Sequence, residues 1–70
     1  MYDIKQIPAN IRNARMQRNY SQEYLAMKLK MSQNGYSKIE LGYTQLTLEK
    51  FLIIAQVLEI PVMDLLNNKS

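Results

Sequence analysis

Hydrophobic residues recur at helical spacing in several short stretches of this chain, and each stretch is bounded by polar or turn-forming residues. The first predicted helix covers residues 8–18. Ile7, Ile11 and Ala14 share one of its faces at spacings of four and three residues. Pro8 suits the first turn, where its missing N–H costs nothing, and Asn19 follows where a left-handed cap is expected.

Two more helices, joined by a tight turn, are predicted within residues 22–40. Leu25, Ala26 and Leu29 share a face in the first, and Tyr36 and Ile39 share a face in the second, which covers residues 33–40. The methyl group of Ala26 allows a close helix crossing. Two helices that cross at about 90–120° over a turn of about three or four residues form a helix-turn-helix.

Serine and threonine stand where these helices and the next one should begin. Ser21 and Ser32 precede the two helices of the turn motif, and Thr47 precedes a fourth helix that continues to Leu58. Between the two helices of the motif, Met31 is apolar among polar neighbours, so we expect it to fill the gap between them.

The C-terminal third of the chain is the most apolar part. The predicted buried stripe of the fourth helix consists of Leu48, Phe51, Leu52, Ala55 and Leu58. Pro61 breaks this helix, because the residue before a proline avoids helical geometry. A fifth helix over residues 62–67 turns Val62, Leu65 and Leu66 inward. The pattern predicts an all-α fold of five short helices around one core.

Composition narrows the possible functions. The 70 residues include no cysteine and no histidine, which removes thiol chemistry and the commonest general base and metal ligand. We therefore expect no enzyme, no metal, no cofactor and no small-molecule ligand. No apolar run approaches the roughly 20 residues of a membrane span, so we expect a cytoplasmic protein without a membrane partner.

Charge is divided unevenly along the chain. Residues 1–38 carry seven basic and two acidic side chains, 7 − 2 = +5, whereas residues 39–70 carry two basic and four acidic ones, 2 − 4 = −2. Such segregation favours a basic face for a polyanion, although charge spread by chance over a solvated surface gives the same totals.

An ordered set of motifs extends over most of the chain. It comprises Ser21-Gln22-Glu23-x-Leu25-Ala26-x-x-Leu29, then Ser32 with Ile39-Glu40-x-Gly42, then Leu48-Glu49-x-Phe51-x-x-Ile54-Ala55. From about residue 7 to residue 66 the chain resembles the Cro/repressor-type helix-turn-helix family, also called the xenobiotic-response-element type. The resemblance implies a compact five-helix repressor-like DNA-binding domain. We place this domain at residues 7–67, between a flexible arm (1–6) and a polar tail (68–70).

The outer face of the third predicted helix carries the candidate base contacts Gln33, Asn34, Ser37 and Lys38. Amide side chains pair with adenine, lysine binds guanine, and serine binds either base. The resemblance implies that Gln33, Asn34 and Lys38 read bases and that Ser37 is secondary. The alternative is an ordinary solvated helix face.

The candidate phosphate contacts are Arg12, Arg15, Ser21, Gln22, Tyr43 and Thr44. Gln22 opens a helix, where free N–H groups and the helix dipole favour anions. The resemblance implies that Arg15 also pairs with Glu40, whereas the residues alone allow a plain surface arginine on the face that carries Arg12 and Arg18. Tyr36 is expected in the core, with its hydroxyl reaching the surface toward a phosphate.

Two positions carry residues that are unfavourable for the backbone expected in a helix-turn-helix. Lys30 stands where the family usually has glycine in a left-handed turn, and an L-residue pays about 1 kcal/mol there. Gly35 lies in mid-helix. Either the backbone approaches DNA closely at that point, or the bulky Tyr36 needs room.

The expected partners are double-stranded DNA and a second copy of the chain. The resemblance implies a homodimer interface in the region of the fourth and fifth helices, and the residues we assign to it are Val57, Ile60, Met63 and Leu66. The alternative is that these residues only complete the core. The predicted function is a sequence-specific transcriptional regulator acting as a repressor. The alternatives are the antitoxin of a toxin–antitoxin pair and a protein-interaction module without a DNA role.

Overall fold

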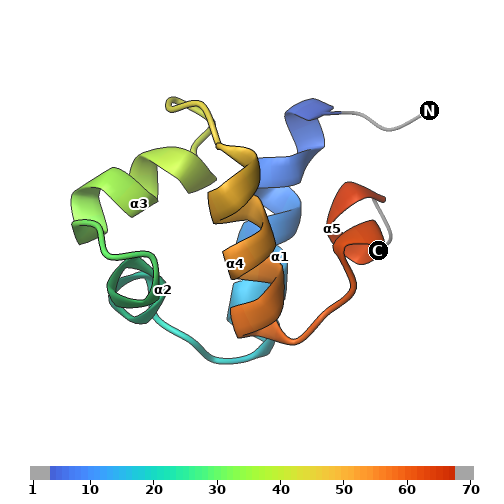
Figure 1. Cartoon of the computed structure of the whole chain (residues 1–70), viewed down its shortest axis with the longest axis horizontal. Coiled ribbons are helices and arrows are strands. Elements are labelled where there is room, and N and C mark those ends of the chain that lie inside the picture. Colours follow the sequence, from blue (N-terminus) through green and yellow to red (C-terminus); the bar gives the residue numbers. More distant parts are fainter. Residues whose placement is uncertain (1–3, 68–70) are drawn as a thin grey trace.

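The structure is a computed structural model that describes residues 4–67, and all of its regular elements are helical. In chain order they are η1 (Ile4–Gln6), α1 (Ile7–Gln17), α2 (Gln22–Lys28), α3 (Gln33–Glu40), α4 (Leu48–Leu58) and α5 (Val62–Leu66). In Figure 1, α4 lies at the centre in front of α1, with α2 and α3 on one side and α5 on the other. The described part is therefore all-α, as predicted.

The predicted helices are all present, with small shifts at their ends. α3 has the predicted bounds, α1 begins and ends one residue earlier than predicted, and α5 ends one residue earlier. Pro8 lies in the first turn of α1, and Asn19 takes the left-handed conformation with φ 60°. A flexible arm was expected over residues 1–6, but Ile4–Gln6 of this stretch forms a 3₁₀ turn. Residues 1–3 of the arm and the tail at 68–70 lie outside the described residues.

Side-chain caps start three of the helices where the sequence predicts them. Ser21 accepts a hydrogen bond from the N–H of Tyr24, and Ser32 accepts one from the N–H of Gly35. Thr47 caps α4 in the same way through Lys50. Each cap satisfies an N–H group that has no partner within the helix. Tyr24 cannot return the bond as a glutamate would, so the reciprocal half of a capping box is missing at α2.

The core lies between α4 and the first three helices and is closed by α5. Its buried members are Ile11, Leu25, Ala26, Leu29, Tyr36, Ile39, Phe51, Ile54, Ala55, Leu58 and Leu65. Ala26 is 2% exposed, and α2 and α3 pack together closely. Met31 packs against this core from the turn between α2 and α3, as expected.

The buried face of α4 agrees with the prediction at Phe51, Ala55 and Leu58 and differs at its other positions. Leu48 and Leu52 are 71% and 48% exposed, whereas Ile54 is fully buried and takes the place assigned to them. α4 is apolar on both flanks, and α1, α2 and α5 pack against the flank that contains Phe51 and Leu58. When both flanks of a helix are apolar, the sequence alone does not show which flank the neighbouring helices will cover.

The turn between α2 and α3 contains the expected left-handed residue. Lys30 has φ 58°, so the turn retains the left-handed backbone although it lacks a glycine. Gly42 follows α3 with φ 79°, which suits the glycine predicted at the helix end. Both ends of α3 are thus set by local backbone geometry.

Candidate nucleic-acid interface

The outer face of α3 presents the four side chains predicted to read bases. Gln33, Asn34 and Lys38 are exposed, and Ser37 is half-buried. The opposite face holds Tyr36 and Ile39, which are 0% and 1% exposed. Burial of one face turns the other toward solvent, and the four polar side chains share one short helix. Their contact with bases stays a prediction.

Leu41 extends this face and was assigned no role from the sequence. It is the C-cap of α3 and is 59% exposed. It follows Asn34 by seven residues and Lys38 by three, a spacing that places side chains on one side of a helix. The spacing can be read from the sequence, but Leu41 was missed because only polar side chains were considered as contacts.

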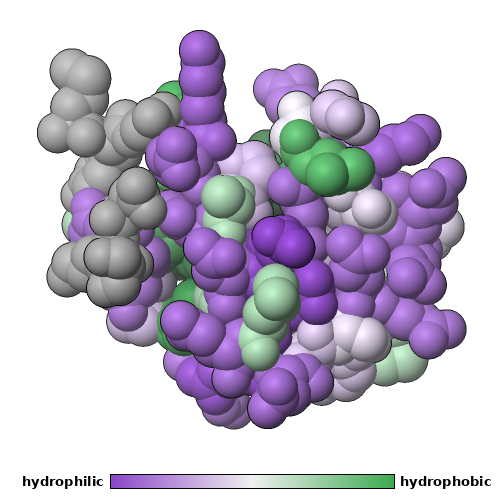
Figure 2. Space-filling view, turned by 180° about the vertical axis from the view of Figure 1, so that it is seen from behind, coloured by the Kyte–Doolittle hydropathy of each residue, from purple (hydrophilic) through white to green (hydrophobic). Residues whose placement is uncertain are grey.

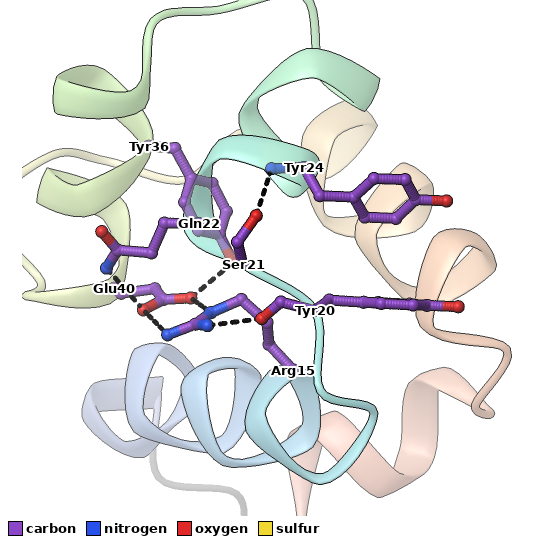
Figure 3. A network of polar contacts seen from close by, with 7 residues as sticks. All are labelled: Arg15, Tyr20, Ser21, Gln22, Tyr24, Tyr36 and Glu40. Atoms are coloured by element: carbon purple, nitrogen blue, oxygen red, sulfur yellow. Dashed lines mark hydrogen bonds and ion pairs between the residues drawn. The ribbon is translucent and has the colours of Figure 1, made fainter.

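Behind this face, one carboxylate collects hydrogen bonds from three helices (Figure 3). Glu40 Oε2 accepts from Arg15 Nε and from Tyr36 Oη, each at 2.6 Å. Glu40 Oε1 accepts from Gln22 Nε2 at 3.1 Å and from Arg15 Nη2 at 3.2 Å. The Glu40 carboxylate therefore ties α3 to α1 and to the first residue of α2.

Arg15 is buried rather than exposed beside Arg12 and Arg18. Only 9% of the residue is accessible, and its remaining nitrogen, Nη1, donates to the carbonyl oxygen of Tyr20 at 2.7 Å. The bidentate pair with Glu40 is present, and it raises the pKa of Arg15 above its ordinary value. All three guanidinium nitrogens donate within the protein, so Arg15 ties α1 to α3 and to the carbonyl of Tyr20, while its contact with a phosphate stays a prediction.

The expectation that the Tyr36 hydroxyl reaches the surface is wrong. Tyr36 is fully buried, and its hydroxyl donates to Glu40 one helical turn away. Burial raises the pKa of Tyr36 well above its ordinary value, and so does the hydrogen bond to a carboxylate. A spacing of four residues on a helix was the available signal for this contact. The wrong expectation came from another rule, that a tyrosine in the core tends to place its hydroxyl where water can reach it.

Opposing effects set the charge state of Glu40. Burial alone would raise its pKa, but hydrogen bonds from Arg15, Tyr36 and Gln22 outweigh burial and hold the pKa below its ordinary value. The carboxylate is therefore ionised at neutral pH. A buried anion with this many donors is a fixed point around which the first three α-helices are arranged.

The remaining candidate phosphate contacts lie at the surface. Arg12, Ser21, Tyr43 and Thr44 are exposed, and Gln22 is half-buried. Ser21 Oγ accepts the cap bond from Tyr24, so its own hydroxyl proton remains a donor. Gln22 Nε2 uses one hydrogen on Glu40 and carries a second. The structure thus places two neutral donors at the N-terminus of α2.

Seen from behind the view of Figure 1, the surface is mostly hydrophilic, with only separated apolar patches (Figure 2). Tyr20 and Tyr24 point away from the Glu40 cluster, with their ring centroids 4.7 Å apart (Figure 3). Lys28 lies over the Tyr24 ring, with its ammonium nitrogen 5.4 Å from the ring centroid. The rings of Tyr20 and Tyr24 therefore lie outside the cluster that ties α3 to α1 and α2, although the Tyr20 carbonyl accepts from Arg15.

Gly35 has a local explanation that neither sequence-based account gave. A Cβ at this position would lie 3.1 Å from Oγ of Ser32 and 3.2 Å from Cε of Met31. Both distances are tight for a carbon atom. The cap of α3 and the methionine in the turn occupy the space that a side chain would need.

The residues predicted to form a dimer interface are only partly accessible. Val57, Ile60 and Leu66 are half-buried against the core, and Met63 is 46% exposed. Between α1 and α5 lies a groove of about 300 Å³ with a mixed polar and apolar lining, formed by Asn10, Asn13, Ala14, Gln17, Ile60, Asp64 and Asn67. Within residues 4–67, no set of carboxylates is grouped to hold a metal ion. No described helix is long and apolar enough to cross a membrane.

Comparison with known proteins agrees with this geometry. A helix-turn-helix family model of the Cro/repressor type matches residues 11–65, which contain α2, α3 and α4 and most of α1 and α5. Neither the curated proteins nor the solved structures gave a match.

Proposed function

This chain belongs to the Cro/repressor-type helix-turn-helix family of DNA-binding regulators, and from that premise we propose that it is a sequence-specific repressor. In this proposal α3 lies in the major groove of double-stranded DNA. The protein acts in the cytoplasm by occupying a promoter, so that transcription cannot start there. The role requires binding and no catalysis.

One observation carries the proposal: α3 exposes amide and ammonium groups while its other face is locked in place. Gln33 and Asn34 stand in the first turn, the part of a recognition helix that reaches base edges. Each amide can form two hydrogen bonds with adenine, and Lys38 can donate to guanine. Because Glu40 fixes the C-terminal end of α3 to α1 and α2, the base-contacting side chains of α3 keep a constant orientation.

The phosphate contacts in this proposal come from the elements that flank α3. The Ser21 hydroxyl and the second N–H of Gln22 donate to one phosphate at the N-terminus of α2, where the helix dipole also favours an anion. Arg12 supplies a cation from α1, while Tyr43 and Thr44 donate from the loop after α3. Neutral donors position the duplex without releasing counterions, so the salt dependence should be modest.

In this proposal, two copies of the chain bind the operator as a two-fold dimer. It places α3 of each protomer in successive major grooves, about 34–36 Å apart, on a near-palindromic operator. The residues proposed for the contact are Val57, Ile60, Met63 and Leu66, at the end of α4 and along α5. Partial burial leaves each with some apolar surface to offer a partner copy.

The base-reading assignment can be separated from the phosphate contacts. Changing both Gln33→Ala and Asn34→Ala should strongly reduce discrimination between operator and scrambled duplex, because only Ser37 and Lys38 remain to contact bases, while the circular dichroism spectrum stays helical. Arg12→Ala is the matched control. It should weaken both duplexes alike and lower the slope of log affinity against log salt by about one. Undiminished discrimination by a folded double variant would refute base reading by α3.

A further inference from the structure

We propose that the buried Tyr36 hydroxyl is a positioning group for phosphate binding: it orients the Glu40 carboxylate, which holds the Gln22 amide at the start of α2. Tyr36 itself touches no DNA in this arrangement. The inference rests on the proposed DNA-binding function, and it adds a residue whose side chain lies entirely inside the protein.

The first step is the way in which the Glu40 carboxylate is held. The torsion that turns a glutamate carboxylate has a broad, nearly two-fold energy profile, so the plane is not set by the side chain itself. Here Arg15 reaches both oxygens, and Tyr36 adds a second short bond of 2.6 Å to Oε2. Removing the hydroxyl leaves Oε2 with the single donor Arg15 Nε among the described residues.

The second step leads from Glu40 to the surface. Glu40 Oε1 accepts from Gln22 Nε2 at 3.1 Å, a longer bond than either bond to Oε2. This longer bond depends on where the carboxylate plane points. If the plane turns, the Gln22 amide loses its anchor, and its second N–H no longer has a fixed direction. Tyr36 and Arg15 therefore orient the carboxylate together, and the Tyr36 bond adds to the hold of Arg15 on the plane from which the Gln22 amide is directed (Figure 3).

The third step is that the hydroxyl remains a donor under all ordinary conditions. Burial and the neighbouring carboxylate raise the pKa of Tyr36, so the phenol stays protonated. Its proton has Glu40 as its acceptor, and no buried side-chain polar atom among residues 4–67 lacks a partner. The hydroxyl therefore has one task, and Tyr36→Phe removes it while keeping the ring in the core.

The link can be tested first without DNA. In the free protein, Tyr36→Phe should move the side-chain amide signals of Gln22 toward those of a solvated glutamine. Nitrogen relaxation should also show greater mobility of Nε2. The control is Tyr24→Phe, whose hydroxyl lies outside the cluster and whose ring stays in place for Tyr20 and Lys28. Gln22 signals that are identical in wild type and Tyr36→Phe would overturn the inference.

The consequence for binding is tested by a double-mutant cycle on a selected operator duplex, at a temperature where all variants are folded. Tyr36→Phe should weaken binding about threefold to tenfold, the effect of about one hydrogen bond. In a Gln22→Ala background the same change should have no further effect. Equal losses in both backgrounds would overturn the positioning role while leaving DNA binding intact. Failure of the wild type to bind any duplex would refute the proposed function, and this inference with it.

Discussion

At the scale of single residues, Glu40 is the group that joins α3 to α1 and α2. Its side chain is 1% exposed, and the cation beside it, Arg15, is 11% exposed. A buried ion pair of this kind contributes little net stability compared with apolar residues, but breaking it by removing one partner leaves a charge in a poorly solvated place. The pair therefore fixes geometry more than it adds stability.

Arg15→Met should lower the free energy of unfolding by about 3 kcal/mol, because it strands the Glu40 anion. Urea denaturation followed by circular dichroism measures the change. Arg18→Met is the matched control, since it breaks the exposed pair with Glu59, whose side chain is 74% accessible. Such surface pairs contribute about 0–1 kcal/mol. Similar losses in both variants would show that Arg15 is no more than a surface arginine.

Stability should also depend on acid through Glu40. The folded protein holds the pKa of this carboxyl below the ordinary 4.5, so the unfolded chain binds the proton more readily. The Glu40 contribution is therefore present above about pH 4.5 and is lost as the pH falls through the folded pKa. Urea midpoints measured from pH 6 to pH 3 should decline less steeply in Glu40→Gln than in wild type. Parallel curves would contradict the depressed pKa.

At the scale of elements, local signals predicted most of the fold. Ser21, Ser32 and Thr47 mark helix starts through chemistry that acts within one turn, and the structure confirms all three caps. The predicted face of α4 was wrong only at Leu48 and Leu52, because both flanks are apolar and tertiary packing decides between them. Tyr36 lies in the core as expected, but the burial of Arg15 and of the Tyr36 hydroxyl was not evident from composition, because each depends on a hydrogen bond to Glu40.

The turn into α3 offers a test at this scale. Lys30 has φ 58°, where a side chain is strained and glycine is not. Lys30→Gly should be more stable than Lys30→Ala by about 1 kcal/mol, since both remove the charge and only one removes Cβ. Thermal unfolding of the two variants measures the difference. An alanine variant at least as stable as the glycine variant would mean that the turn is not left-handed.

At the scale of the whole molecule, the proposed two-fold dimer makes a prediction about mass in solution. Sedimentation of Met63→Asp should show a lower mass than wild type if α5 and the end of α4 form the contact. Leu48→Asp serves as the control, because Leu48 is 71% exposed at the opposite end of α4. A loss of mass in Leu48→Asp alone would move the interface to the start of α4. Equal masses for wild type and both variants would argue against a dimer through either end of α4.

The most direct test of the account is a selection of bound duplexes from a random library, run in parallel with wild type and with the variant carrying Gln33→Ala and Asn34→Ala. Wild type should enrich one near-palindromic sequence whose half-sites lie about one helical turn apart. The folded double variant should lose the preference at the base positions that the two amides contact. Enrichment of the same sequence by both proteins would contradict base reading by α3, and the absence of any enriched sequence with wild type would contradict sequence-specific binding itself.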